Sequence, residues 1–329
     1  MRKSLLLALV LGVSLFVFAH GIAFGSEVLT LRVGHGTQVT HPAHLATAKF
    51  AELVKEKSNG QMVIEVFPAR QLGDDGELLE QAMNGTLEMA NVPTSIFSKY
   101  TPALDVLQLP FLLSNYEKEL KAILSDEFKE ILSEIEALGL KPLCVNEWGI
   151  RHLANNVRPI NKPEDLAGLK MRVVPSAIVR NTISALGGNP TPMAYGEVYT
   201  ALHTKVLDGE EINYTSVFSE KHYEVIKFFS DIGLFPFPGF LVMHKETYEK
   251  LTDDQKNVLE ESAKEIVFYV KDLLTDLDRQ STETMIANGI EITYVKDLEP
   301  FKEKVKPIYE EYSKKGDKYV NFIRMAEKL

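Results

Sequence analysis

Short apolar runs typical of β-strands alternate with helix-like stretches along most of the chain. This alternation favours a largely parallel sheet whose faces are covered by helices. The 329 residues are enough for about two domains, since a domain averages ~150 residues. The chain is therefore predicted to be an α/β protein. Strands are expected at residues 29–33, 61–67, 87–91, 141–146, 151–154, 170–173, 210–213, 225–229 and 240–243. Helices are expected at residues 42–57, 76–84, 117–137, 177–186, 195–202, 299–313 and 317–328.

One further predicted helix is longer than a small domain. Thr252 and Gln255 form a capping-box pattern, and the helix that they open can run to Asn288, before Gly289. A helix of about 35 residues would be roughly 50 Å long at 1.5 Å per residue. The segment is therefore expected to brace two domains, with a kinked pair of helices as the alternative. Its apolar residues recur at the helical period: Leu259, Ala263, Ile266, Val270, Leu273 and Leu277.

The first 26 residues have the pattern of a secretory signal peptide. Arg2 and Lys3 precede an apolar run over residues 5–19, which small residues follow at 23–26. The run is short for a membrane span. The pattern predicts export to the periplasm with cleavage near Ser26 or Glu27, and an uncleaved anchor is the alternative.

Charge and cysteine content narrow the classes of function. Loss of Arg2 and Lys3 would lower the formal net charge from -10 to -12, which disfavours nucleic acid as a partner. The single cysteine, Cys144, allows no intrachain disulfide and no thiolate metal cluster. His41 and His44 are three residues apart at a helix start, where capping is favoured over metal binding. No cofactor is expected.

Two arginines are candidates for ligand binding. Arg151 and Arg172 lie in short apolar runs that read as strands, where an arginine is seldom found unless it is paired or directed at a ligand. A guanidinium group matches a carboxylate in bidentate geometry. The alternative is that both are surface residues paired with Glu147 or Asp165.

Several longer strings then identify a resemblance. The chain resembles the extracytoplasmic solute-binding subunits of TRAP (tripartite ATP-independent periplasmic) transporters over essentially its whole mature length. The strings that carry the resemblance lie at residues 67–68, 71–75, 109–111, 149–151, 156–160, 163–173, 190–202 and 208–211.

The resemblance implies a two-lobed periplasmic binding protein fold with a long helix spanning both lobes. Residues 1–26 would be the signal peptide. Lobe I would comprise residues 27–148 and about 238–275, and lobe II residues 149–237 and about 276–329.

It also implies roles for individual residues. Arg172 stands at the position of the principal contact to a ligand carboxylate, and Arg151 at that of a supporting arginine. Tyr195 falls where relatives place an aromatic wall, and Asp75 and Glu211 fall near polar contacts.

One position departs from the family pattern. Members of the sialic acid type carry Asn directly after the Glu, whereas here Ile212 follows Glu211 and the amide comes one place later, at Asn213. If Ile212 faces the cleft, a compact 2-oxo or 2-hydroxy acid is favoured over a sugar acid with many hydroxyls, because a buried hydroxyl without a partner costs about 1–3 kcal/mol. If Ile212 points into the lobe core, it carries no information about the ligand.

The sequence is thus interpreted as a periplasmic protein that captures a small carboxylate and delivers it to TRAP permease subunits in the membrane. It is not expected to be an enzyme. The alternatives are a secreted α/β enzyme acting on an anionic substrate and a ligand-sensing subunit of a signalling receptor. The apolar residues of the last helix are expected either to join copies of the chain or to pack on their own lobe; they are Tyr319, Val320, Phe322, Ile323 and Met325.

Overall fold

The computed structural model describes residues 28–329, which form two β-sheets; the predicted signal peptide lies outside the described residues. The first sheet has the strand order β2-β1-β3-β10-β4 and the second β11-β9-β5-β8-β6-β7. The strands of the first sheet are β1 (Leu29–Gly34), β2 (Met62–Phe67), β3 (Met89–Pro93), β4 (Leu140–Asn146) and β10 (Gly239–His244). Those of the second are β5 (Ile150–Asn155), β6 (Lys170–Val173), β7 (Asn189–Pro192), β8 (Gly209–Ile212), β9 (Phe228–Pro236) and β11 (Glu291–Tyr294).

Both sheets are mixed, so the expectation of a largely parallel sheet holds only in part. In the first sheet β1 is parallel to β2 and β3, whereas β10 is antiparallel to β3 and β4. In the second sheet β5 is antiparallel to both of its neighbours, β8 and β9. The antiparallel pairs arise because β10 and β5 enter their sheets directly from the other sheet, without a crossover helix.

Helices cover both sheets, and we call each sheet with the helices packed on it the first and the second lobe. The helices are α1 (Pro42–Lys57), α2 (Asp75–Asn84), α3 (Tyr116–Ile123), α4 (Asp126–Glu136), α5 (Ala177–Ala185), α6 (Val198–His203), α7 (Tyr214–Ser219), α8 (Lys245–Glu249), α9 (Asp253–Ala287), α10 (Glu299–Ser313) and α11 (Asp317–Ala326). Short 3-10 helices are η1 (Thr94–Lys99), η2 (Ala103–Gln108), η3 (Pro163–Leu166), η4 (Tyr195–Glu197) and η5 (His222–Glu224).

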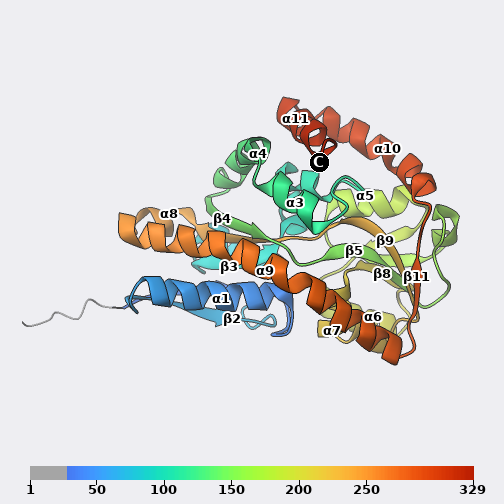
Figure 1. Cartoon of the computed structure of the whole chain (residues 1–329), viewed down its shortest axis with the longest axis horizontal. Helices are drawn as coiled ribbons and strands as arrows, with labels where there is room; N and C mark the ends of the chain where they lie inside the picture. The colour runs from blue at the N-terminus through green and yellow to red at the C-terminus, as the bar shows by residue number, and fades with distance from the viewer. Residues whose placement is uncertain (1–27) are drawn as a thin grey trace, which may run out of the picture.

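The long helix α9 crosses from one lobe to the other without a break, as predicted. Figure 1 shows it running along the molecule, with α1 and β2 beside one end and α6 and α7 beside the other. The Thr252 side chain accepts a hydrogen bond from the Gln255 amide, which confirms the capping box. Ile266 packs in the core of the first lobe, and Met285 packs in a core of the second.

Within the described residues four segments connect the lobes: residues 147–149 between β4 and β5, residues 237–238 between β9 and β10, α9, and residues 314–316 between α10 and α11. The first of them is held by Glu147, whose Oε1 accepts hydrogen bonds from the backbone amides of Trp148 (3.1 Å) and Gly149 (2.7 Å). Gly149 has φ +136°, and a Cβ there would meet Asn213 Nδ2 at 2.4 Å. Glycine is required at this connection because both its backbone angle and its surroundings exclude a side chain.

Two helix predictions need correction. The helix expected over residues 117–137 is two helices, α3 and α4, because Ser125 caps a new helix by accepting a hydrogen bond from the Phe128 amide. The helix expected over residues 195–202 begins instead as the 3-10 turn η4 and continues as α6.

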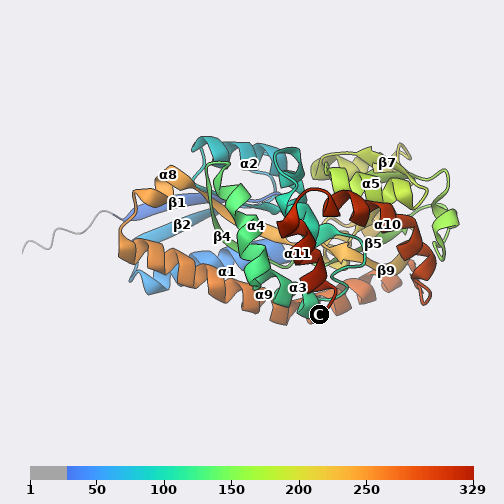
Figure 2. The same cartoon turned by 90° about the horizontal axis from the view of Figure 1, so that it is seen from above.

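The last helix, α11, packs against α3 and α4, near the middle of the molecule in Figure 2. Tyr319, Phe322 and Ile323 are buried in a core within the chain. These three residues therefore serve intrachain packing, the second of the two expectations, whereas Val320 and Met325 are half-buried and association between copies stays a prediction. The lobe boundaries drawn from the sequence stay a prediction, and they place α11 in lobe II although it packs on helices that flank β4.

Gly239, at the start of β10, should tolerate no larger residue. A Cβ at this position would lie 2.1 Å from the Trp148 ring, which is fixed by a 2.6 Å hydrogen bond from its Nε1 to Asn146 Oδ1. We expect Gly239→Ala to lower the free energy of unfolding by about 1–3 kcal/mol, the usual cost of overpacking. Urea denaturation measures this. Gly76→Ala is the matched control, since a Cβ there meets nothing within 4 Å. An unchanged midpoint for Gly239→Ala would contradict the packing described here.

Candidate functional site

A small cleft lies where the two lobes meet. Its lining comes from the loop after β1, the ends of β3 and β6, strand β5, and the two connections between the lobes. In sheets with helices on both faces, ligands bind beyond the carboxyl ends of the strands. The residues that line the cleft are Thr37, His41, Asp75, Pro93, Trp148, Arg151, Arg172, Val174, Tyr195, Ser216 and Phe237.

Arg172 is almost fully buried, at 1% exposed, near the end of β6. Its Nε and Nη2 donate to the carbonyl oxygen of Met193, at 3.1 and 3.0 Å. Its Nη1 lies 3.6 Å from Glu211 Oε1 and has no hydrogen-bond partner among residues 28–329. Since a buried donor without a partner is costly, the cleft presents a guanidinium N–H that an anion would satisfy.

Arg151 lies next to it on β5 and is also buried. Its Nη1 donates to the Glu211 carbonyl oxygen at 3.1 Å, and its Nε lies 3.3 Å from Glu211 Oε2. The centre of the Phe237 ring is 3.4 Å from the guanidinium carbon. Burial lowers the pKa of Arg151, and the Glu211 carboxylate opposes this shift. Glu211 thus holds two arginines in place.

Asp75 approaches the cleft from the opposite lobe, as the first residue of α2. Burial raises the pKa of its carboxyl to about 6, against the charges of Arg70 and Arg172. A Cβ at Gly36 would come within 2.5 Å of Asp75 Oδ1, so the small residue leaves room for the carboxyl. Tyr195, on η4, completes one wall, with its ring 5.7 Å from the guanidinium carbon of Arg172.

The structure therefore brings four of the predicted site residues into the cleft and leaves three outside it. Arg151, Arg172, Tyr195 and Asp75 line the cleft. Behind this lining lie Glu211, which binds the two arginines, and Asn213, whose Nδ2 donates to the Trp148 carbonyl oxygen at 2.6 Å.

Ile212 does not face the cleft. It is fully buried in the core formed by α6, α7 and β9, with Val198, Val217 and Phe229. Successive side chains of a strand point to opposite faces. Because Glu211 points to the arginines, Ile212 must point away from them. The preference for compact acids that depended on Ile212 facing the cleft therefore has no basis.

Other lining residues were not predicted from the sequence. Trp148 and Phe237 come from the two connections between the lobes, where no periodic pattern marks a site. His41 was predicted to cap a helix, and its Nδ1 does accept a hydrogen bond from the Ala43 amide of α1. Its other nitrogen, Nε2, lies 3.1 Å from Ser216 Oγ of the second lobe.

An ion pair also joins the lobes beside the cleft. Arg70 of the first lobe donates through Nη1 and Nη2 to the two carboxylate oxygens of Glu220, both at 3.2 Å. Arg70 Nη1 also donates to the Gly36 carbonyl oxygen at 2.6 Å. This bidentate pair stabilises the arrangement in which the lobes are closed on each other. The partners are 150 positions apart, and no local sequence signal connects them.

Known proteins are similar to this chain in sequence and in fold. The model of the family described as bacterial extracellular solute-binding protein, family 7, matches residues 33–315. A solute-binding protein of Chromohalobacter salexigens is 33% identical over 276 residues, which cover 83% of this chain and 81% of that protein. The 2,3-diketo-L-gulonate-binding periplasmic protein of Escherichia coli K12 is 30% identical over 308 residues, covering 86% of this chain and 93% of its own.

Solved structures of solute-binding proteins have a similar fold. The crystal structure of a TRAP periplasmic solute-binding protein from Roseobacter denitrificans, with bound β-D-glucuronate, has a TM-score of 0.86 at 30% identity. The match covers 91% of this chain and 99% of that one. Two lobes, a helix across both and a cationic cleft between them define a solute-binding protein of the periplasmic type. The chain belongs to the bacterial extracellular solute-binding protein family 7, the TRAP type, as its sequence predicted; this is a binding-protein family and not an enzyme family.

Proposed function

We propose that the chain captures a carboxylate ligand in the cleft, with Arg172 as the anchor. The observation that carries the proposal is the buried Nη1 of Arg172, which lines the cleft without a hydrogen-bond partner in the described part of the chain. Arg151 supports it from β5, which β8 separates from β6 in the sheet. Because the site is largely shielded from water, a charge-assisted bond to a carboxylate is stronger here than at the surface.

The remaining lining suits a ligand that carries several hydroxyl groups. Thr37, Ser216 and Asp75 offer oxygen atoms to hydroxyls. Trp148 and Tyr195 add aromatic surface, which suits the C–H groups of a sugar. We therefore propose a sugar acid, with a hydroxyl next to its carboxylate, in preference to a small oxo acid. The glucuronate and diketogulonate named for the two relatives above are sugar acids and support this class.

Delivery to a membrane permease follows from the TRAP type and belongs to the same proposal. The relatives are periplasmic proteins, which supports export of this chain through the N-terminal signal. Over residues 28–329, no helix has the length and apolar character needed to cross a membrane.

Sugar acids should stabilise the protein without being converted. A ligand at ~100 times its dissociation constant that binds only the folded state adds about 2.7 kcal/mol to the free energy of unfolding. In a thermal-shift panel we expect D-glucuronate and D-galactonate to raise the melting temperature most. Pyruvate and succinate should shift it less, and the amides of the sugar acids should not shift it. A larger shift with pyruvate than with every sugar acid would reject the sugar acid class, and equal shifts with the amides would reject the carboxylate anchor.

A further inference from the structure

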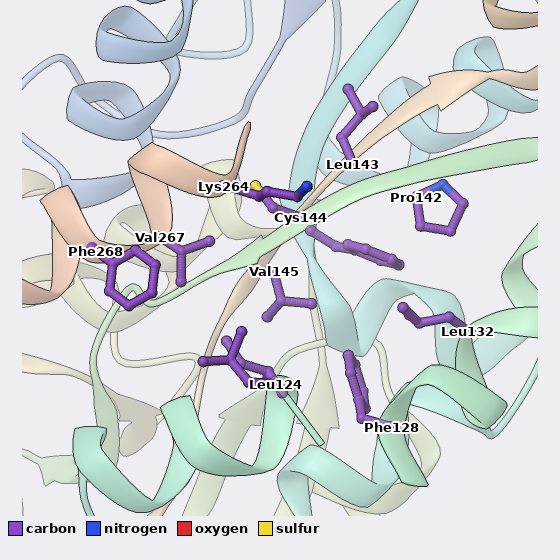
Figure 3. A pocket seen from close by; sticks show the side chains of 12 residues that line it. Leu124, Phe128, Leu132, Pro142, Leu143, Cys144, Val145, Lys264, Val267 and Phe268 are labelled. Atoms are coloured by element: carbon purple, nitrogen blue, oxygen red, sulfur yellow. The ribbon is translucent and has the colours of Figure 1, made fainter. Parts of the chain in front are cut away.

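A second pocket lies on the first lobe, away from the cleft (Figure 3). Its walls come from α3, α4, β4, β10 and α9, and it shares no lining residue with the cleft. In Figure 3, Phe128 and Leu132 of α4 lie on one side and Val267 and Phe268 of α9 on the other. The cavity has a volume of about 180 Å³.

The size and the walls of this pocket suit one apolar ring. An apolar cavity of ~150 Å³ is large enough to bind benzene. The interior is lined mainly by aliphatic and aromatic side chains, and Leu124 and Phe268 remain 54% and 49% exposed. These two side chains leave apolar surface of the pocket open to solvent. The pocket therefore favours an aromatic or branched aliphatic body over a sugar.

The charges of the pocket favour an anion. Lys264 of α9 is its charged lining residue. Glu260, one turn earlier, is already bonded to Lys141 (2.9 Å) and to the Tyr248 hydroxyl (2.7 Å). Cys144 lines the same end, and burial raises the pKa of its thiol to about 12, so it stays neutral and does not repel an anion. Within residues 28–329 no salt bridge involves Lys264, so its ammonium is available to an acidic group in the pocket.

We propose that this pocket is a second binding site, for a small aromatic carboxylate of benzoate size. The ring lies between α4 and α9, and the carboxylate binds the Lys264 ammonium. The site is independent of the cleft and of the sugar acid that we propose for it.

Methyl NMR tests the proposal, because leucine and valine methyl groups report on both sites. Leu124, Leu132, Val145 and Val267 line the pocket, whereas Val174 lines the cleft. With benzoate as the probe, we expect saturable shifts of the pocket methyl groups, in the wild type and in Arg172→Ala alike. Benzyl alcohol should shift the same signals more weakly, and acetate should not shift them.

Substitutions distinguish the contribution of the Lys264 charge to binding from that of the cavity. Lys264→Gln should weaken benzoate binding about two- to fivefold, as for an exposed ion pair, and should leave benzyl alcohol binding unchanged. Lys271→Gln is the matched control on the same helix, and should have no effect. Leu132→Trp should fill the cavity and abolish binding of both probes.

Three results would overturn the proposal. The first is benzoate shifts at Val174 that vanish in Arg172→Ala, with none at the pocket, because the cleft alone would then bind the probe. The second is an equal response to acetate. The third is concentration-dependent dimerisation in sedimentation that Leu132→Trp abolishes, because a second copy of the chain would then occupy the pocket.

Discussion

Arg172→Ala should lose at least a hundredfold in affinity for the best sugar acid while remaining folded. Breaking a buried charge pair costs about 3–5 kcal/mol, and each ~1.4 kcal/mol is tenfold in affinity. The fold should survive because Glu211 keeps Arg151 and the Val174 amide as partners. Isothermal titration calorimetry measures the affinity, and circular dichroism measures the fold.

The control for this variant is a second arginine of the same lobe. Arg158 donates to the carbonyl oxygens of Asp165 and Ala167 and does not line the cleft. Arg158→Ala should therefore leave the affinity unchanged. The affinity of Arg172→Lys should lie between those of Arg172→Ala and the wild type, because lysine keeps the positive charge but lacks the planar guanidinium fork. A loss below tenfold for Arg172→Ala would show that this residue is not the anchor.

The elements that the sequence predicted well carry their own local signals. Helix α1 has the predicted limits because Pro42 suits the first turn and His41 caps it. Strand β6 and helix α10 also have the predicted limits. The strands that were missed, β7 and β11, are short edge strands of the second sheet. Strand β7 contains Pro190 and Pro192. Proline argues against a strand in the sequence, although an edge strand tolerates it.

The sequence pointed to the charged residues of the cleft and to Tyr195, but not to Trp148 or Phe237. Arg151 and Arg172 stand out because arginine is rarely buried in a strand unless it is paired or directed at a ligand. The sequence did not indicate which way Ile212 points. All four residues of β8 are buried, so the strand shows no alternation of apolar and polar residues that would separate its two faces. Trp148 and Phe237 reach the cleft from connections between the lobes, and Arg70 meets Glu220 across the two lobes. Such contacts depend on tertiary structure that no local pattern encodes.

Glu211→Gln should lower the free energy of unfolding by about 3–5 kcal/mol, the cost of removing one partner from a buried charge cluster. The substitution keeps the shape of the side chain, so the effect arises from leaving Arg151 and Arg172 without the carboxylate that lies 3.3 and 3.6 Å from them.

A bound carboxylate would restore a negative charge to the same arginines. The sugar acid should therefore bind Glu211→Gln more tightly than the wild type and, at equal ligand concentration, raise its free energy of unfolding by more. Urea denaturation with and without ligand supplies both free energies. Glu283→Gln, which removes one of the two exposed carboxylate partners of Arg279, is the control and should change neither the stability nor the gain from the ligand. If Glu211→Gln matches the wild type in stability, Glu211 does not hold the two arginines; if it is destabilised but gains no more from the ligand, the arginines do not bind the carboxylate.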